Sequence, residues 1–118
     1  DYTNAKNKRK KLTQKIYEVL DNFDILITPT NFDLPFDLGD ISQINKYYMR
    51  HARSPFNVSG NPAISVPCGL SKTNLPIGFQ IVGRYNADQF ISDIAHDFLI
   101  KTDWENIRKK EIIRADFI

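Results

Sequence analysis

The first part of the chain has the apolar spacing of an amphipathic helix, from about Asn4 to Asp21. Its apolar residues recur every three or four positions, which places them on one face. The face is expected to contain Leu12, Ile16, Val19 and Leu20, followed by Phe23. The other faces carry Lys6, Lys8, Arg9, Lys10, Lys11 and Lys15. A basic helix can bind RNA, but no interleaved aromatic residues accompany this one, so a solvated surface is the favoured interpretation.

A second helix is expected to begin at Asp40, which forms a capping pattern with Gln43. Its shared face would hold Ile41, Ile44 and Tyr48, with His51 one turn further on. The pair Ser54-Pro55 should interrupt it, because a residue before proline is disfavoured in the helical conformation.

A third helix is expected after Asn86, which resembles a capping box together with Gln89. The stripe that follows is broad and apolar, and would cover a sheet. It consists of Phe90, Ile91, Ile94, Ala95, Phe98 and Leu99.

Three short runs predict strands. Residues 24–28 form an apolar, β-branched run that stops at Pro29, and this is typical of a buried strand. Residues 63–67 and 77–83 flank a polar connection and predict a β-hairpin. The expected fold class is α/β: one hairpin and one short strand, covered by about three helices.

Length and composition limit the options. The chain has 118 residues, 42% of them hydrophobic, which suits one core. A net charge of +2 gives no case for nucleic acid or a membrane surface, and no apolar run is long enough to span a bilayer. Cys68 is the only cysteine, which excludes a disulfide within the chain and fits a reducing, cytoplasmic location. Because the chain begins with Asp1, we expect further residues before it.

No constellation for independent catalysis is apparent. The chain contains neither a G-x-S-x-G elbow nor an S-x-x-K pair. Cys68 could be a nucleophile with His51 or His96, but a single cysteine at a strand end is more often a small buried hydrophobe. The two histidines are far apart and no cysteine pair accompanies them, so neither a metal site nor any cofactor is expected.

Four stretches together resemble the amidase-signature family. The longest runs from Pro55 to Gly69 (PFNVSGNPAISVPCG) and is followed by residues 75–83 (LPIGFQIVG). Residues 24–30 (DILITPT) and 102–104 (TDW) resemble the flanking motifs of the same family. The similarity runs from about residue 5 to 105 in the right order.

The resemblance implies that residues 1–118 are the C-terminal part of an amidase domain with a large mixed sheet. Members of the family hydrolyse amides with a Ser–Ser–Lys triad and a glycine-rich oxyanion loop, all of which precede this region, so no catalytic residue is assigned here. The segment would supply scaffold and pocket wall around a small-molecule amide. By position, the lining residues would be Phe32, Leu34, Arg53, Ser54 and Phe56.

One departure bears on the substrate. Glutamyl-tRNA amidotransferase A subunits, which belong to this family, have an acidic residue shortly before their equivalent of Pro55 that holds the amino group of glutamine. Residues 47–54 contain Arg50, His51 and Arg53 but no carboxylate. A general amidase pocket that tolerates an anionic substrate is therefore favoured over a glutamine site. A non-catalytic remnant or interaction module and a fragment of such an amidotransferase remain alternatives, and oligomeric state is left open.

Overall fold

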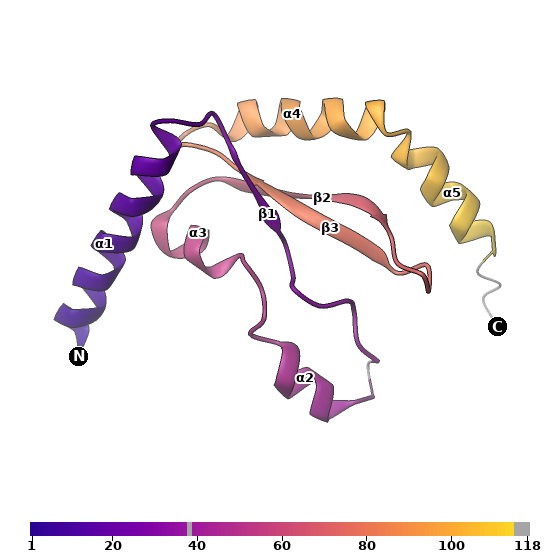
Figure 1. Cartoon of the computed structure of the whole chain (residues 1–118), viewed down its shortest axis with the longest axis horizontal. Coiled ribbons are helices and arrows are strands. Elements are labelled where there is room, and N and C mark those ends of the chain that lie inside the picture. Colours follow the sequence, from indigo (N-terminus) through magenta and orange to yellow (C-terminus); the bar gives the residue numbers. More distant parts are fainter. Residues whose placement is uncertain (38, 115–118) are drawn as a thin grey trace.

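A three-stranded sheet with helices on both faces forms the centre of the molecule (Figure 1). The structure, a computed structural model, describes residues 1–37 and 39–114. Its elements along the chain are α1 (Tyr2–Leu20), β1 (Leu26–Pro29), α2 (Ile41–Tyr47), α3 (Ser54–Ser59), β2 (Ala63–Leu70), β3 (Pro76–Val82), α4 (Asp88–Lys101) and α5 (Trp104–Arg114). The predicted α/β class, with a hairpin and one short strand, is confirmed, and the short helix α3 and the helix α5 add to the three predicted helices.

The strands lie in the order β1-β3-β2, and both neighbouring pairs are antiparallel. The β2–β3 hairpin is the predicted one, with a register shift between Pro67 and Gly69. β1 differs from the prediction of a buried strand, because it lies at one edge of this sheet and Ile27 is 62% exposed. Pro29 belongs to the strand instead of stopping it, since an edge strand tolerates a proline.

Each face of the sheet has its own apolar cluster. On one face, Ile16 and Leu20 of α1 pack with Phe56 of α3 and Val82 of β3. On the other face, α4 buries Ile91 and Ala95 against the strands. α4 thus covers one face of the sheet, whereas the end of α1 and the helix α3 pack on the other face around Val82 at the end of β3, and the rest of α1 extends beyond the sheet (Figure 1).

Several residues placed on the apolar faces of predicted helices are exposed. Ile41 and Tyr48 of the second predicted helix are 71% and 67% exposed, and His51 lies beyond the end of α2, in a bridge with Asn31.

Val19 and Phe23, at the end of the first helix, are 43% and 61% exposed, and Phe90 of α4 is 48% exposed. Apolar spacing shows which face of a helix is apolar, but not how much of that face is covered. In α1, only Ile16 and Leu20 are buried. The lysines predicted on its other faces are exposed as expected.

The helix starts were predicted with mixed success. Asp40 caps α2 as predicted, since its Oδ1 accepts the backbone N–H of Gln43 at 3.0 Å. Ser54-Pro55 does not merely interrupt a helix: it begins α3, because proline is well tolerated in a first turn. The capping box at Asn86 is wrong, since Asn86 adopts a left-handed φ of 64° and α4 begins after Ala87 without a side-chain cap.

The molecule is open. Its radius of gyration is 17.2 Å, against about 13.5 Å for a compact domain of this length. Among the described residues, eight hydrophobic side chains are buried and fifteen large ones are exposed. α1, α2 and α5 extend away from the sheet (Figure 1), which leaves apolar surface uncovered. No helix within residues 1–37 and 39–114 is long and apolar enough to cross a membrane.

Candidate functional site

The segment between β1 and α3 folds back on itself and projects from the sheet. We call residues 31–53, apart from residue 38, the arm. Its two ends meet in an antiparallel bridge between Asn31 and His51. The bridge is extended by hydrogen bonds of 3.2 Å from the N–H of Phe32 to the carbonyl of Arg50 and from the N–H of Ala52 to that of Thr30. The backbone therefore brings together residues about twenty positions apart.

A small pocket lies inside the arm. It has a volume of about 160 Å³. Its walls come from Asn31, Asp33, Leu34, Pro35, Phe36, Tyr47, Tyr48, Arg50 and Arg53. The space is below the roughly 300–1,000 Å³ of a site that holds a whole drug-sized ligand. It can hold only a small group.

The polar side of this pocket is ordered by Arg50. Its Nε donates to Oδ2 of Asp33 at 2.7 Å, and its guanidinium carbon lies 5.7 Å from the ring centre of Tyr47. Nζ of Lys46 lies 5.1 Å from the centre of the same ring. These two contacts orient the guanidinium, although 55% of the Arg50 side chain is exposed.

The five residues predicted to line a substrate pocket are spread over three places. Leu34 and Arg53 line the arm pocket. Phe32 and Ser54 are exposed and lie outside its lining residues. Phe56 lies in the apolar cluster beneath α1. A substrate-lining role for this set stays a prediction.

Sequence reasoning did not place the other lining residues here, Asp33 and Tyr47 foremost. Asp33 is separated from Arg50 by 17 positions, and nothing in the local pattern indicates that the two meet. Their proximity follows from the bridge between Asn31 and His51, a long-range pairing that no periodicity reports. The one available signal was the concentration of opposite charges on the two sides of the predicted loop and helix.

A row of polar side chains joins the arm to the sheet. Thr28, Gln80 and Ser65 occupy one rung across the three strands. Gln80 is 3% exposed, and its Nε2 donates to Oγ1 of Thr28 at 2.8 Å and to the carbonyl of Ala52 at 3.0 Å. The hydroxyls of Thr30 and Ser65 lie 2.8 Å apart. This half of the sheet face is polar, whereas the half beneath α1 and α3 is apolar.

Among the described residues, neither Cys68 nor the serine of the Ser59-Gly60 pair is paired with a base. Ser59 is buried and its hydroxyl lies 2.6 Å from Oδ1 of Asn61. Cys68 is exposed, not buried as expected, because it lies at the register shift of the edge strand β2, and its Sγ lies 3.5 Å from the carbonyl of Ile77. In the part of the chain that the structure describes, no serine or cysteine is hydrogen-bonded to a histidine or a lysine, and no group of three metal-ligating side chains occurs.

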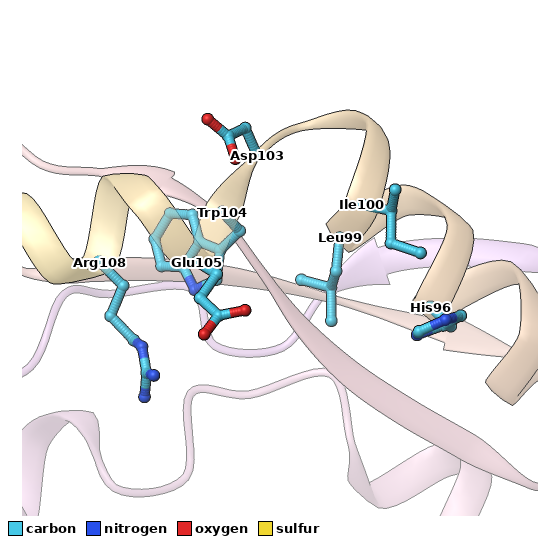
Figure 2. A pocket seen from close by; sticks show the side chains of 7 residues that line it. All are labelled: His96, Leu99, Ile100, Asp103, Trp104, Glu105 and Arg108. Atoms are coloured by element: carbon cyan, nitrogen blue, oxygen red, sulfur yellow. The ribbon is translucent and has the colours of Figure 1, made fainter.

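The histidines do not complete a catalytic pair either. Nδ1 of His51 is buried and has no hydrogen-bond partner among the described residues. His96 is exposed at a hollow of about 530 Å³ between α4 and α5. In Figure 2, Leu99 lies between His96 and the carboxylate of Glu105. The hydrogen bond and charge of Lys109 lower the pKa of Glu105, which makes it a poor proton acceptor.

The hollow between α4 and α5 is larger than the arm pocket, but its side chains are less well ordered. The space between α4 and α5 combines an exposed imidazole, an ion-paired carboxylate and the indole of Trp104 (Figure 2). None of these groups is positioned by a buried partner. The arm pocket is smaller, but its arginine is held by two neighbours and its frame is tied to the sheet through Gln80.

Comparison with known proteins places this geometry in a family. The glutamyl-tRNA(Gln) amidotransferase A subunit of Dehalococcoides mccartyi (strain ATCC BAA-2266 / KCTC 15142 / 195) is 40% identical over 105 residues, which cover 87% of this chain and 21% of that protein. The A subunit of Nitrosospira multiformis (strain ATCC 25196 / NCIMB 11849 / C 71) is 31% identical over 112 residues, or 93% of this chain and 23% of that protein. The chain thus spans about a fifth of the length of the curated relatives it matches.

Solved structures agree with these relatives. The crystal structure of the glutamyl-tRNA(Gln) amidotransferase A subunit from Thermotoga maritima matches with a TM-score of 0.70 and 38% identity, over 76% of this chain and 20% of that one. The structure of 6-aminohexanoate cyclic dimer hydrolase matches with a TM-score of 0.60 and 30% identity, over 72% and 21%. The family described as Amidase matches residues 1–91, most of the chain. The chain therefore belongs to the amidase family.

Proposed function

We propose that residues 1–118 form a partial amidase domain within a hydrolase that cleaves carboxylic amide bonds. The match to the amidase family over residues 1–91 is the observation that carries this proposal. The segment would contribute part of the sheet and one wall of the substrate pocket, built from the arm.

The reaction requires groups from outside the segment. An activated serine hydroxyl would attack the amide carbonyl, so that a C–O bond forms and the C–N bond breaks, with a proton delivered to the leaving amine. Water would then release the carboxylic acid and restore the hydroxyl. A lysine acting as base must be neutral, which requires burial or a neighbouring positive charge. By family resemblance, both serines and the lysine precede this region.

A second candidate is the A subunit of a glutamyl-tRNA(Gln) amidotransferase. It is favoured by the identity of 40% to the Dehalococcoides mccartyi protein. Residues 47–54 weigh against a glutamine site, because they contain two arginines and no carboxylate that could hold an ammonium group. A clear preference for glutamine over other amides in the complete enzyme would establish this candidate instead.

Two experiments test the leading proposal. Reading the gene upstream of Asp1 should reveal a glycine- and serine-rich loop and a lysine. If these are lacking, the segment is a non-catalytic remnant or an interaction module. The complete protein should then convert aliphatic amides to the acid and ammonia, measured by ammonia release. No release from any amide tested would contradict the proposal.

A further inference from the structure

We infer that the arm pocket binds a carboxylate of the substrate through Arg50 and Arg53. The inference deepens the proposed function, on which it rests for the identity of the ligand as an amide. It names the class of substrate: an amide whose far end carries a negative charge.

The first support is the unused half of the Arg50 guanidinium. Asp33 accepts only its Nε–H, at 2.7 Å. Within residues 1–37 and 39–114, its two terminal nitrogens make no hydrogen bond. A guanidinium has five N–H donors in a planar fork that matches the geometry of a carboxylate. The Asp33 bond and the Tyr47 ring hold this fork in place, while its remaining donors stay available.

The second support is the balance of charge in the pocket. Its charged lining residues are Arg50, Arg53 and Asp33, so the lining has one positive charge in excess. Arg53 is exposed and makes no ion pair within the described part of the chain. A single carboxylate would neutralise that excess. The carboxylate would bind Arg50, which Asp33 already orients, and Arg53, whose side chain could turn toward it.

The third observation concerns the apolar residues that line the arm pocket. Leu34, Pro35 and Phe36 form an apolar side beside the two arginines. These side chains could contact the apolar spacer of a substrate whose carboxylate meets the arginines. The volume of about 160 Å³ leaves room for a terminal carboxylate and a short piece of its chain. The reacting amide would lie outside this pocket.

The test uses matched pairs of substrates with the complete enzyme. One member of each pair is an ω-carbamoyl carboxylate, with spacers from two to six methylene groups. The other is its neutral isostere, in which an isopropyl group replaces the carboxylate. We expect kcat/KM for the carboxylate to exceed that of its isostere by about tenfold or more at the best spacer, as expected for charge-assisted hydrogen bonds. Glutarate, which contains no amide, serves as a binding probe in titration calorimetry.

Variants then assign the preference to the pocket. Arg50→Gln and Arg53→Gln should each bring the ratio of the two kcat/KM values toward one and weaken glutarate binding about tenfold. Arg53 is exposed, so Arg53→Gln is informative even if Arg50→Gln misfolds. Arg108→Gln on α5 removes the same charge far from the arm and should keep the ratio.

The possible outcomes distinguish a failure of the carboxylate site from a failure of the proposed hydrolase activity. Amide turnover without preference for the carboxylate overturns the inference and leaves the proposed function intact. Glutarate binding that depends on Arg50 and Arg53, without turnover of any amide, supports the anion site and refutes the hydrolase. A carboxylate preference that survives both arginine substitutions means that the pair of Arg50 and Asp33 only joins the two sides of the arm, and the inference fails.

Discussion

The sheet with α4 and the arm are built on different principles. In the first region, Val66, Ile81 and Ile91 are at most 3% exposed and pack in one apolar cluster. In the arm, the residues that face its pocket are joined by an ion pair, an aromatic contact and a few backbone hydrogen bonds. The difference shows that apolar burial stabilises the sheet, whereas polar contacts order the arm, which is the part to which we assign the proposed substrate wall.

The largest expected effect is in the sheet. Ile81→Ala removes a side chain that is 1% exposed, so it should lower the free energy of unfolding by about 2–5 kcal/mol, measured by chemical denaturation. Ile41→Ala in the arm is the matched control, since Ile41 is 71% exposed, and should cost no more than about 0.5 kcal/mol. Equal costs would mean that further polypeptide buries the arm, and the contrast between the two regions would disappear.

A smaller effect is expected where the sheet meets α4. A Cβ on Gly83 would lie 2.7 Å from Cγ2 of Ile91 and 3.1 Å from Cβ of Ala87. Gly83→Ala should therefore cost about 1–3 kcal/mol through overpacking. A Cβ on Gly69 would meet nothing within 4 Å, so Gly69→Ala provides the control. A melt of Gly83→Ala that coincides with the control would show that this contact is loose.

The junction of the two regions depends on Gln80. Gln80→Leu would leave the carbonyl of Ala52 and the hydroxyl of Thr28 without this donor, at a cost of about 1–3 kcal/mol. Because the bond to Ala52 holds the end of the arm, limited proteolysis should cleave residues 31–53 faster than in the parent protein. Gln14→Leu, which removes a bond on the exposed face of α1, should leave that cleavage rate unchanged. Unaltered cleavage in Gln80→Leu would show that other contacts hold the arm.

The smallest effect concerns the start of α2. The hydrogen bond from the backbone N–H of Gln43, together with that from its side chain, lowers the pKa of Asp40 below its ordinary value of 3.8. Since the folded pKa is the lower one, the cap stabilises the arm above the ordinary value and this contribution is lost as pH falls through the folded pKa. An NMR titration of the Asp40 carboxyl should show a midpoint below 3.8. A midpoint at or above that value would contradict the cap.

The sequence predicts the scaffold better than the arm, for a physical reason. Ile91 and Ala95 recur at helical spacing, and the hairpin strands flank a polar turn, so local patterns carry both elements. The helix α3 was missed because Pro55 fits the start of a helix as well as the end of one. The pocket depends on the pairing of Asn31 with His51, and a contact between distant residues leaves no periodic trace.

The family resemblance predicts some pocket residues that hydrophobic periodicity does not, but not all of them. It points to the loop after β1 and to the residues before Pro55, and of the residues named there Leu34 and Arg53 line one pocket. It did not indicate that Asp33 would hold Arg50, nor that Phe56 would lie in the core. Those details come from side-chain packing specific to this chain.

We propose that this segment shapes one wall of an amidase pocket, while the groups that break the bond come from outside residues 1–118. The most direct test is an ammonia-release assay on purified material of these 118 residues alone, beside the complete protein at equal concentration. We expect ammonia release by the complete protein and none by the segment. Turnover by the segment, with contaminating hydrolase excluded by mass spectrometry, would contradict it.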